Sequence, residues 1–335
     1  MRIAVLGPLD HALREPFAGG LERHTVQLAG GLAALGHEVT LFAKPGSEAP
    51  DGALLHACGS GYRQAITAIR AGQYDIVHNN TARRVPSFLG LLLPVPVVST
   101  LHTPPYRGLA AVAVLSRLKR RHRYVAISDF CAGQWQPFTG GSQTIYNGID
   151  VSAWSFSPSP KADRLVWSGR ISPEKGVEYA IDVAERAGYD LDLAGSLFDR
   201  DYFATKVQPR LSGAIRYHGH LSGERLARLY GGAAAGLFTS VWDEPFGLVI
   251  PEMLACGTPV AAFDSGAARE LIDPGVGVVV PKYDVSALAE SLDAVIRLPR
   301  ERCRSHVEHR FRLEQMIASY ARLYETLTGG GASGN

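Results

Sequence analysis

Short apolar runs alternate along the chain with longer stretches whose apolar residues recur at helical spacing. Residues 2–7 form a continuous apolar run closed by glycine, which predicts a buried strand. Residues 21–36 carry apolar side chains at helical spacing and end at Gly36, a plausible helix stop. Strands joined through helices run parallel, because a crossover of this length is needed between parallel neighbours. Further strands are predicted at 37–43, 74–80, 96–102, 123–128, 164–170, 191–196, 214–220, 236–240, 259–263 and 276–280.

A Ser- and Pro-rich segment interrupts this alternation at residues 155–163 and is the predicted linker. We therefore expect two doubly wound, Rossmann-like α/β domains that face each other across a cleft, a division that suits 335 residues. Ligands of such sheets bind beyond the carboxyl ends of the strands. The expected parts are residues 1–157, residues 158–312, a helix at 313–328 that packs back on the first domain, and a flexible tail at 329–335.

Composition and charge exclude several classes of protein. The formal net charge of +2 is too small to indicate nucleic acid binding, and no apolar stretch approaches the roughly 20 residues of a membrane span. Residues 1–150 carry 14 Lys and Arg against nine Asp and Glu, and the remainder carries 20 against 23. The four cysteines include no CxxC pair, which argues against a disulfide framework or a zinc site. These features predict a cytoplasmic protein.

Three local patterns could carry chemistry. Gly19 and Gly20 precede a predicted helix, where backbone N–H groups could approach an anion or simply form a turn. Arg170 ends a predicted strand and Lys175 follows at the mouth of the next helix, where two cations could hold a diphosphate. Solvated loop charges are the ordinary alternative for that pair.

The third pattern is WDEPFGLVIPE at residues 242–252, in which two glutamates bracket a turn and an apolar run. A helix is predicted from about Phe246 to Gly257, with Glu244 in the loop before it and Glu252 about one turn inside it. An acidic residue near a helix start contributes typically about 0.3–1 kcal/mol, so capping explains one glutamate. It does not explain the second, and the two carboxylates together favour ligand binding.

This stretch resembles the E-x7-E signature of family-4 retaining glycosyltransferases of the GT-B fold. The family's other landmarks appear in the family's order, and the resemblance spans roughly residues 2–325. They are Gly19-Gly20, GHEVTLF (36–42), HTPP (102–105), VAIS (125–128), YNGID (146–150) and SGRISPEKG (168–176). The resemblance implies an acceptor-binding first domain and a nucleotide-sugar-binding second domain.

The resemblance also implies a role for each matching residue. Arg170 and Lys175 would neutralise the diphosphate, helped by Gly19 and Gly20, and His102 would face the transferred sugar. Glu252 would accept hydrogen bonds from the ribose and Glu244 from the donor sugar. The N–H groups of Phe246, Gly247 and Leu248 would contact that sugar and the distal phosphate, and the backbone of Leu221 would contact the base. The predicted donor is a UDP-sugar in preference to a GDP-sugar, with no obligatory metal ion.

Other functions are also compatible with these motifs. A nucleotide-sugar 2-epimerase can share the fold, and so can a nucleotide-sugar-binding protein that has lost catalysis; the ordered motifs favour transfer. The DRD sequence at 199–201 could bind a metal, but a chance D-x-D is common. The basic run at 117–123 is a solvated helix face or a weak contact with a membrane surface or an acidic acceptor. The acceptor (a sugar, a lipid-linked sugar or a small-molecule natural product) is left open.

Overall fold

The structure, a computed structural model, describes residues 1–17, 19–59, 61–119, 121–160 and 164–329. Its chain divides into two compact units, one of Met1–Gly148 together with the residues from Leu313 onward, the other of Ile149–Arg312. The expected linker begins after this division. Trp154 stacks on Tyr230 with ring centroids 5.6 Å apart, and the N–H of Ser157 donates to the carbonyl of Cys256 at 3.1 Å. These contacts fasten the segment to the second unit; residues 161–163 and the end of the tail, 330–335, lie outside the described residues.

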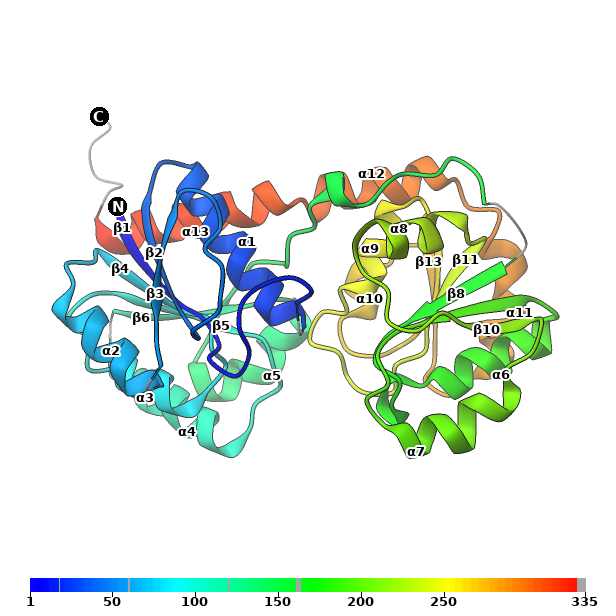
Figure 1. Ribbon diagram of the computed structural model, residues 1–335, viewed down its shortest axis with the longest axis horizontal. Helices are drawn as coiled ribbons and strands as arrows, with labels where there is room; N and C mark the ends of the chain where they lie inside the picture. The colour runs from blue at the N-terminus through cyan, green and yellow to red at the C-terminus, as the bar shows by residue number, and fades with distance from the viewer. Residues whose placement is uncertain (18, 60, 120, 161–163, 330–335) are drawn as a thin grey trace. The chain divides into compact units, whose positions relative to one another are not determined.

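The first unit is built on a seven-stranded parallel sheet, ordered β3-β2-β1-β4-β5-β6-β7 (Figure 1). Its central strands are continuous apolar runs, as expected where helices cover both faces of a sheet. The strands are β1 (Arg2–Leu6), β2 (Glu38–Ala43), β3 (Ala53–Ala57), β4 (Ile76–Asn79), β5 (Val97–Leu101), β6 (His122–Ala126) and β7 (Gln143–Thr144).

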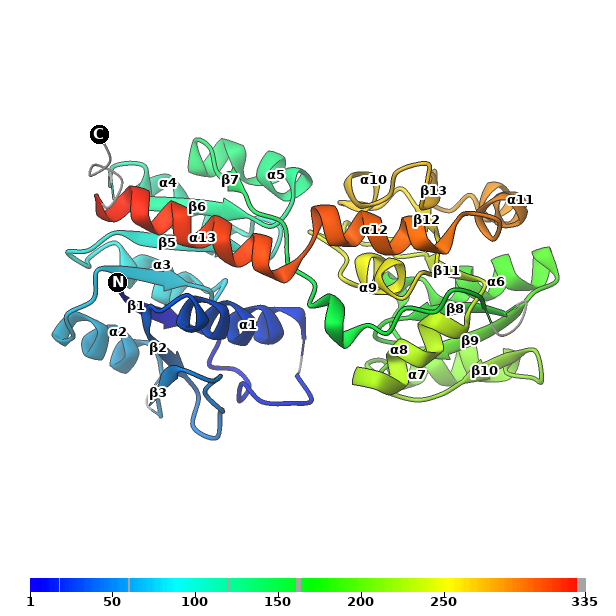
Figure 2. The same cartoon turned by 90° about the horizontal axis from the view of Figure 1, so that it is seen from above.

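The helices of the first unit cover both faces of this sheet. On one face α1 (Gly20–Ala34) and α13 (Leu313–Thr328) lie side by side (Figure 2) and enclose Ile3 and Val5 of β1. Their approach is close: a Cβ added to Gly31 would stand 2.0 Å from the Cδ1 atom of Ile317. The other helices of this unit are α2 (Tyr62–Ala71), α3 (Arg84–Gly90), α4 (Arg107–Ser116) and α5 (Asp129–Thr139), of which α2 packs on Ala4 and Leu6.

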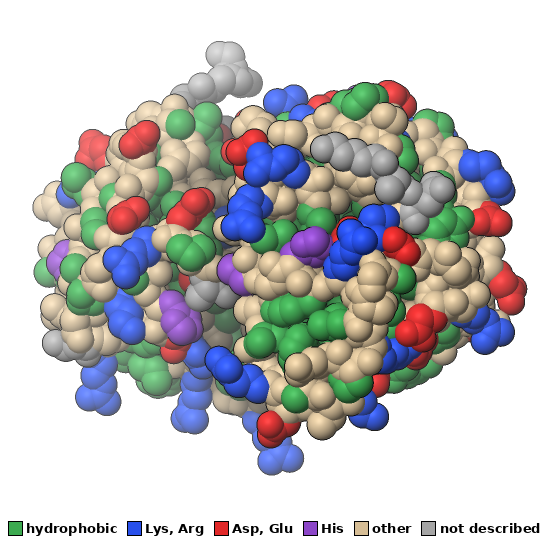
Figure 3. All heavy atoms as spheres, turned by 45° about the vertical axis from the view of Figure 1, so that its right-hand side comes forward, with side chains coloured by type: hydrophobic (Ala, Val, Ile, Leu, Met, Phe, Trp, Pro, Cys, Tyr) green, Lys and Arg blue, Asp and Glu red, His purple; other side chains and the backbone are tan. Residues whose placement is uncertain are grey.

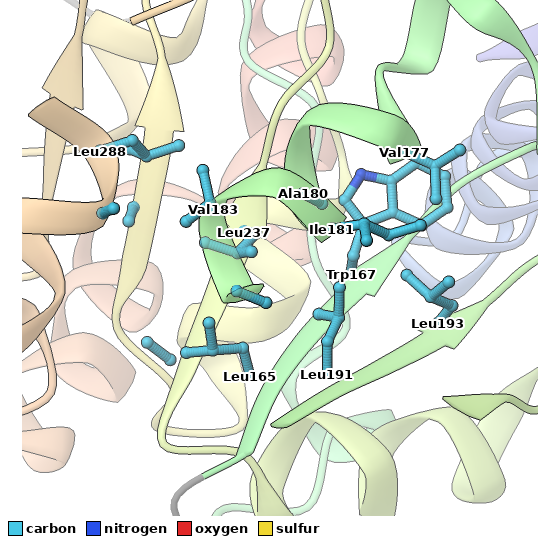
Figure 4. Packing of buried hydrophobic residues seen from close by; sticks show 14 of the residues in the cluster. Leu165, Trp167, Val177, Ala180, Ile181, Val183, Leu191, Leu193, Leu237 and Leu288 are labelled. Carbon is cyan, nitrogen blue, oxygen red and sulfur yellow. The ribbon is translucent and has the colours of Figure 1, made fainter. Parts of the chain in front are cut away.

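The second unit has a six-stranded parallel sheet, ordered β10-β9-β8-β11-β12-β13. Figure 4 shows part of its core, in which Trp167 of β8 packs among Val177, Ile181 and Leu193. The strands are β8 (Arg164–Ser168), β9 (Asp190–Ala194), β10 (Ile215–Tyr217), β11 (Ala235–Phe238), β12 (Val260–Phe263) and β13 (Gly277–Val280). The helices are α6 (Val177–Ala187), α7 (Arg200–Tyr202), α8 (Gly223–Gly232), α9 (Val249–Ala255), α10 (Ala268–Leu271), α11 (Val285–Val295) and α12 (Arg300–Arg310).

The helix predicted at 313–328 is α13, and it is separated from α12 by a break in the chain. The chain leaves helical geometry at Phe311, whose carbonyl accepts a hydrogen bond from the N–H of Ile149 at 2.7 Å, and Arg312 pairs with Ile149 in an isolated parallel bridge. That pairing engages backbone groups that a continuous helix would use internally. The break separates α12, in the second unit, from α13, in the first.

Candidate active site

In the second unit, Arg170 follows the carboxyl end of β8. Its side chain is about half exposed (51%), and the guanidinium carbon lies 4.8 Å from the centroid of the Phe198 ring. A guanidinium nitrogen lies 3.9 Å from the Glu174 carboxylate. Gly195, at φ +154°, lets the neighbouring loop approach, because a Cβ there would stand 1.7 Å from the carbonyl oxygen of Gly169. Arg170 is thus held over an aromatic ring with its charge still open to solvent.

Lys175 ends a short 3-10 turn, Pro173–Lys175, on the same edge of the sheet. Its ammonium group donates to the Glu244 carboxylate, and the two side chains are only 19% and 14% exposed. Gly176 follows in the left-handed region (φ +66°), and its carbonyl accepts from the Thr239 hydroxyl at 2.7 Å. Gly is the residue this turn requires, since a Cβ would stand 2.0 Å from the Thr239 carbonyl oxygen.

The loop that carries Glu244 is tied down at both its side chain and its backbone. The Ser240 hydroxyl lies 3.2 Å from the Glu244 carboxylate, and the Glu244 carbonyl accepts from the N–H of Ala267 at 3.0 Å. The loop between β11 and α9 therefore presents a carboxylate that is already hydrogen-bonded and paired with a cation.

The helix predicted from Phe246 begins three residues later, at Val249. Gly247 takes a left-handed conformation (φ +87°), which turns the chain before the helix starts. Among the described residues, the N–H groups of Gly247 and Leu248 donate to no backbone carbonyl. Glu252 lies in α9 and is buried, with 5% of its surface exposed. The segment thus offers backbone donors beside two carboxylates.

Some of the predicted site residues of the second unit contact one another, and others do not. Contacts link Lys175 directly to Glu244, and Arg170 lies near Glu174, whose carbonyl accepts from the N–H of Val241 in the Glu244 loop at 3.0 Å. Leu221 lies half-buried in the loop between β10 and α8. Its predicted role is a contact with the base of the nucleotide, and none of these contacts tests that role.

The first unit places His102 directly after β5, beside the carboxyl end of β4. Its Nε2 lies 2.5 Å from the Oδ1 of Asn80, and the ring lies edge-on to His24 with centroids 4.8 Å apart. The Asn80 amide nitrogen donates to Thr25 Oγ1 at 2.7 Å and to His24 Nδ1 at 3.0 Å. Thr25 donates its own proton to the Leu21 carbonyl, so its hydroxyl must accept from Asn80. This fixes which atom of the Asn80 side-chain amide is the nitrogen and which is the oxygen.

This network sets the proton positions on His102. Because Asn80 Oδ1 can only accept, His102 Nε2 carries the proton and Nδ1 is left as an acceptor. Burial, with the nearby His24 and His78, holds the pKa of His102 well below its ordinary value, so the ring is neutral at pH 7. A neutral imidazole at the end of β5 can accept a hydrogen bond from a hydroxyl.

Gly19 and Gly20 stand at the start of α1. Gly19 is extended and gives the helix no side-chain cap. The Glu22 carboxylate belongs to the first helical turn, and its Oε2 atom would lie 3.2 Å from a Cβ at Gly19. A negative charge at this helix end is favourable, so a phosphate here would share the position with a carboxylate.

Two family models match the chain. Residues 18–153 match Glycosyltransferase Family 4, and residues 153–310 match Glycosyl transferases group 1, so that together they span residues 18–310. The chain belongs to glycosyltransferase family 4. The phosphatidyl-myo-inositol mannosyltransferase of Mycolicibacterium smegmatis is 27% identical over 375 residues, which cover 99% of this chain and 95% of the relative. The family and the enzyme class predicted from the sequence, a glycosyltransferase, are confirmed.

Solved structures confirm the GT-B fold of this family 4 glycosyltransferase. Sucrose-phosphate synthase from Thermosynechococcus elongatus superposes with a TM-score of 0.80 at 22% identity, covering 98% of this chain and 100% of that one. Anabaena HepE in complex with UDP-glucose gives 0.77 at 19% identity, covering 97% and 100%. The roles assigned to individual residues of the glycosyltransferase stay predictions.

The sequence did not single out several groups that this glycosyltransferase places around the predicted residues. Asn80, which orients His102, was visible only as a polar pair after a buried strand, Asn79-Asn80. Polar residues at the ends of neighbouring parallel strands are the signal that could have found it. Ser240 and Phe198 carried no such signal, because a serine after a strand and an exposed aromatic residue are both common.

The alternative sites of the sequence have structural explanations. Asp199 of the DRD sequence caps α7 by accepting from the N–H of Tyr202 at 2.8 Å. Among the described residues of the glycosyltransferase, no group of three or more His, Cys, Asp and Glu side chains has a metal-binding arrangement. Within the same residues, no helix combines the length and apolar character needed to cross a membrane. Lys/Arg and Asp/Glu side chains are interspersed on the face shown in Figure 3.

Proposed function

We propose that this glycosyltransferase transfers a hexose-type sugar from a nucleotide diphosphate sugar, UDP-linked in preference to GDP-linked, to an acceptor hydroxyl with retention of anomeric configuration. The observation that carries the proposal is the contact between Lys175 and Glu244 at the carboxyl edge of the second sheet. This contact places Lys175, the cation predicted to bind the diphosphate, beside Glu244, the carboxylate predicted to bind the donor sugar. HepE, of the same fold, binds UDP-glucose, which supports the choice of nucleotide.

The chemistry needs charge stabilisation at the leaving group. As the bond from the anomeric carbon to the phosphate oxygen breaks, negative charge grows on the diphosphate. Arg170 and Lys175 would offset it, together with the N–H groups of Phe246, Gly247 and Leu248. The acceptor oxygen would bond to the same face of the anomeric carbon, and its proton would pass to a phosphate oxygen. This route needs no covalent carboxylate nucleophile.

The remaining residues would bind and orient the substrate. Glu252 is proposed to accept from the ribose hydroxyls, and the backbone of Leu221 to contact the base. His102 of the first unit, neutral and with Nδ1 as its acceptor, is proposed to accept from a hydroxyl of the transferred sugar. With two cations on the diphosphate, a divalent metal ion is not required.

Transfer assays on the full chain test the donor site. Arg170→Ala and Lys175→Ala should each slow transfer by orders of magnitude, whereas Lys206→Ala, which removes an exposed cation from the same unit, should not. Glu252→Ala should weaken binding of UDP by calorimetry. Wild-type turnover in both cation variants would refute the mechanism.

Product analysis tests the reaction type. NMR of the product should show the donor's anomeric configuration, and chelation with EDTA should leave the rate unchanged. An inverted product, or activity lost to EDTA and restored by Mg²⁺, would overturn the corresponding part of the proposal. Incubation of UDP-glucose alone should produce no 2-epimer.

A further inference from the structure

The first unit has a hollow of about 630 Å³ at the amino ends of β6 and β7. Arg117, Lys119 and Arg123 line it together with residues 139–143, which connect α5 to β7. We call this hollow the basic pocket. It takes in Arg117, Lys119, His122 and Arg123 of the basic run that the sequence singled out; Arg121 does not line it, and Arg120 lies outside the described residues.

The basic pocket lies away from the edge of the sheet that carries His102. Strands β5 and β6 are parallel, with Val97 paired to His122 at their amino ends and Leu101 paired to Ala126 at their carboxyl ends. Strands of five residues span roughly 16 Å at about 3.3 Å per residue. The pocket opens at the amino ends, whereas His102 follows the carboxyl end of β5. A ligand in the pocket would therefore not be the reacting sugar.

The charge of the basic pocket is of one sign. No Asp or Glu is among its lining residues. Arg117 and Lys119 are exposed, and neither forms an ion pair with a carboxylate among the described residues. Gly140, in the left-handed region (φ +76°), brings the opposite loop close, since a Cβ there would stand 3.1 Å from Arg117 Nε. Two cations without carboxylate partners beside a hollow favour the binding of an anion.

The lining also contains a buried polar group without a partner. His122 is 7% exposed, and its Nδ1 has no hydrogen-bond partner among the described residues. Its Nε2 lies 3.1 Å from the Ser99 hydroxyl, which accepts from the Asn79 amide at 3.2 Å and has no other acceptor for its own proton among the described residues. His122 Nε2 then accepts, and Nδ1 carries a proton. An unpaired buried N–H is costly, and an anionic ligand could satisfy it directly or through water.

We propose that the basic pocket binds the phosphate group of a phosphorylated ligand, at the edge of the first sheet opposite to the one that carries His102. Arg117 supplies a planar fork of donors, Lys119 a mobile charge, and the Ser142 hydroxyl, which has no hydrogen-bond partner among the described residues, a neutral donor. The volume lies within the range of about 300–1,000 Å³ typical of small-molecule pockets, so the ligand extends beyond its phosphate. Leu118, next to Lys119 and 80% exposed, gives an apolar surface beside the charges, so the phosphate can belong to a soluble molecule or to a lipid headgroup.

Two probes on the full chain separate these sources. Inorganic pyrophosphate is titrated while the His122 ring signals are followed by NMR, assigned with His122→Gln. Vesicles of phosphatidylcholine with and without phosphatidylglycerol are used in sedimentation assays. The test variant is Arg117→Gln/Lys119→Gln, and the control is Arg63→Gln/Arg70→Gln, which removes the same charge from exposed positions on α2.

We expect at least one probe to bind to the wild type and to the control, and the test variant to bind at least tenfold more weakly. Binding of pyrophosphate with movement of the His122 signals identifies a soluble phosphate ligand. Binding only to vesicles that contain phosphatidylglycerol identifies a lipid phosphate. Failure of both probes to bind, or an equal loss in the test and control variants, would overturn the proposal. Pyrophosphate can also bind at Arg170 and Lys175 of the proposed donor site, so its binding to the basic pocket is measured from the His122 signals only.

Discussion

The contact between Lys175 and Glu244 should behave as an energetically coupled pair. The perturbations are Lys175→Met, which keeps the apolar stem, Glu244→Gln, which keeps the shape and can still bond Ser240, and the double variant. Each single change leaves one charge without its partner in a largely buried place, whereas the double change leaves none. The free energy of unfolding should therefore fall less in the double variant than the two single losses predict.

The structure sets the size of this coupling. Breaking a fully buried pair costs about 3–5 kcal/mol, because the remaining charge is uncompensated. The two side chains here are 19% and 14% exposed, so water partly relieves the remaining charge. We expect about 2–3 kcal/mol for each single change and a coupling energy of about 1–3 kcal/mol, the range for residues in contact.

Urea unfolding followed by tryptophan fluorescence measures these losses, because three of the four tryptophans (Trp154, Trp167 and Trp242) belong to the second unit. The same four proteins should be tested for UDP binding by calorimetry, where Lys175→Met weakens binding and Glu244→Gln does not. Single losses that add to the double loss within about 0.5 kcal/mol would refute the pairing as an energetic unit.

Three further predictions concern the scaffold. Gly195→Ala should destabilise the second unit by about 2 kcal/mol or more and reduce transfer, because its Cβ would meet the Gly169 carbonyl at 1.7 Å; a normal melting temperature would contradict this. Arg300→Met should cost about 3 kcal/mol or more in urea unfolding, because the buried guanidinium donates to the carbonyls of Ser157, Gly231 and Ala233, and each acceptor left unpaired costs about 1–3 kcal/mol. The pKa values of His24 and His122 are lowered by burial to about 4, so only the unfolded chain takes up these protons between pH 6.5 and 4. Stability should thus be full above pH 6.5 and fall toward pH 4 by about 3 kcal/mol per histidine, and His122→Gln should reduce the slope of stability against pH.

The sequence predicted the central strands well and the edges of the sheets poorly. β1 and β8 are continuous apolar runs because helices cover both of their faces. β3 was not predicted, and its Leu54 is 71% exposed, so its pattern lacks the buried run on which such predictions depend. β7, with two residues, is too short to leave any periodic signal.

The candidate site was predictable where a motif is local and not where it depends on strand order. Lys175 and Glu244 were recognised from separate motifs, but their mutual contact required β8 and β11 to be neighbours. Asn80 meets His102 only because β4 and β5 are adjacent in the sheet. Sequence patterns give the ends of strands, whereas the order of strands decides which ends meet.

The break at Phe311 has a consequence for how the chain is made. Met316, Ile317 and Tyr320 of α13 complete the core around β1 and α1, yet ribosomes produce them only after the entire second unit. During synthesis the first 148 residues therefore keep an apolar face uncovered until α13 has been made. The second unit can fold as soon as its own residues have been made. A fragment of residues 1–148 should accordingly be prone to aggregation, and a separately supplied α13 peptide should rescue its solubility. The first unit can therefore complete its core only after the whole polypeptide has been synthesised.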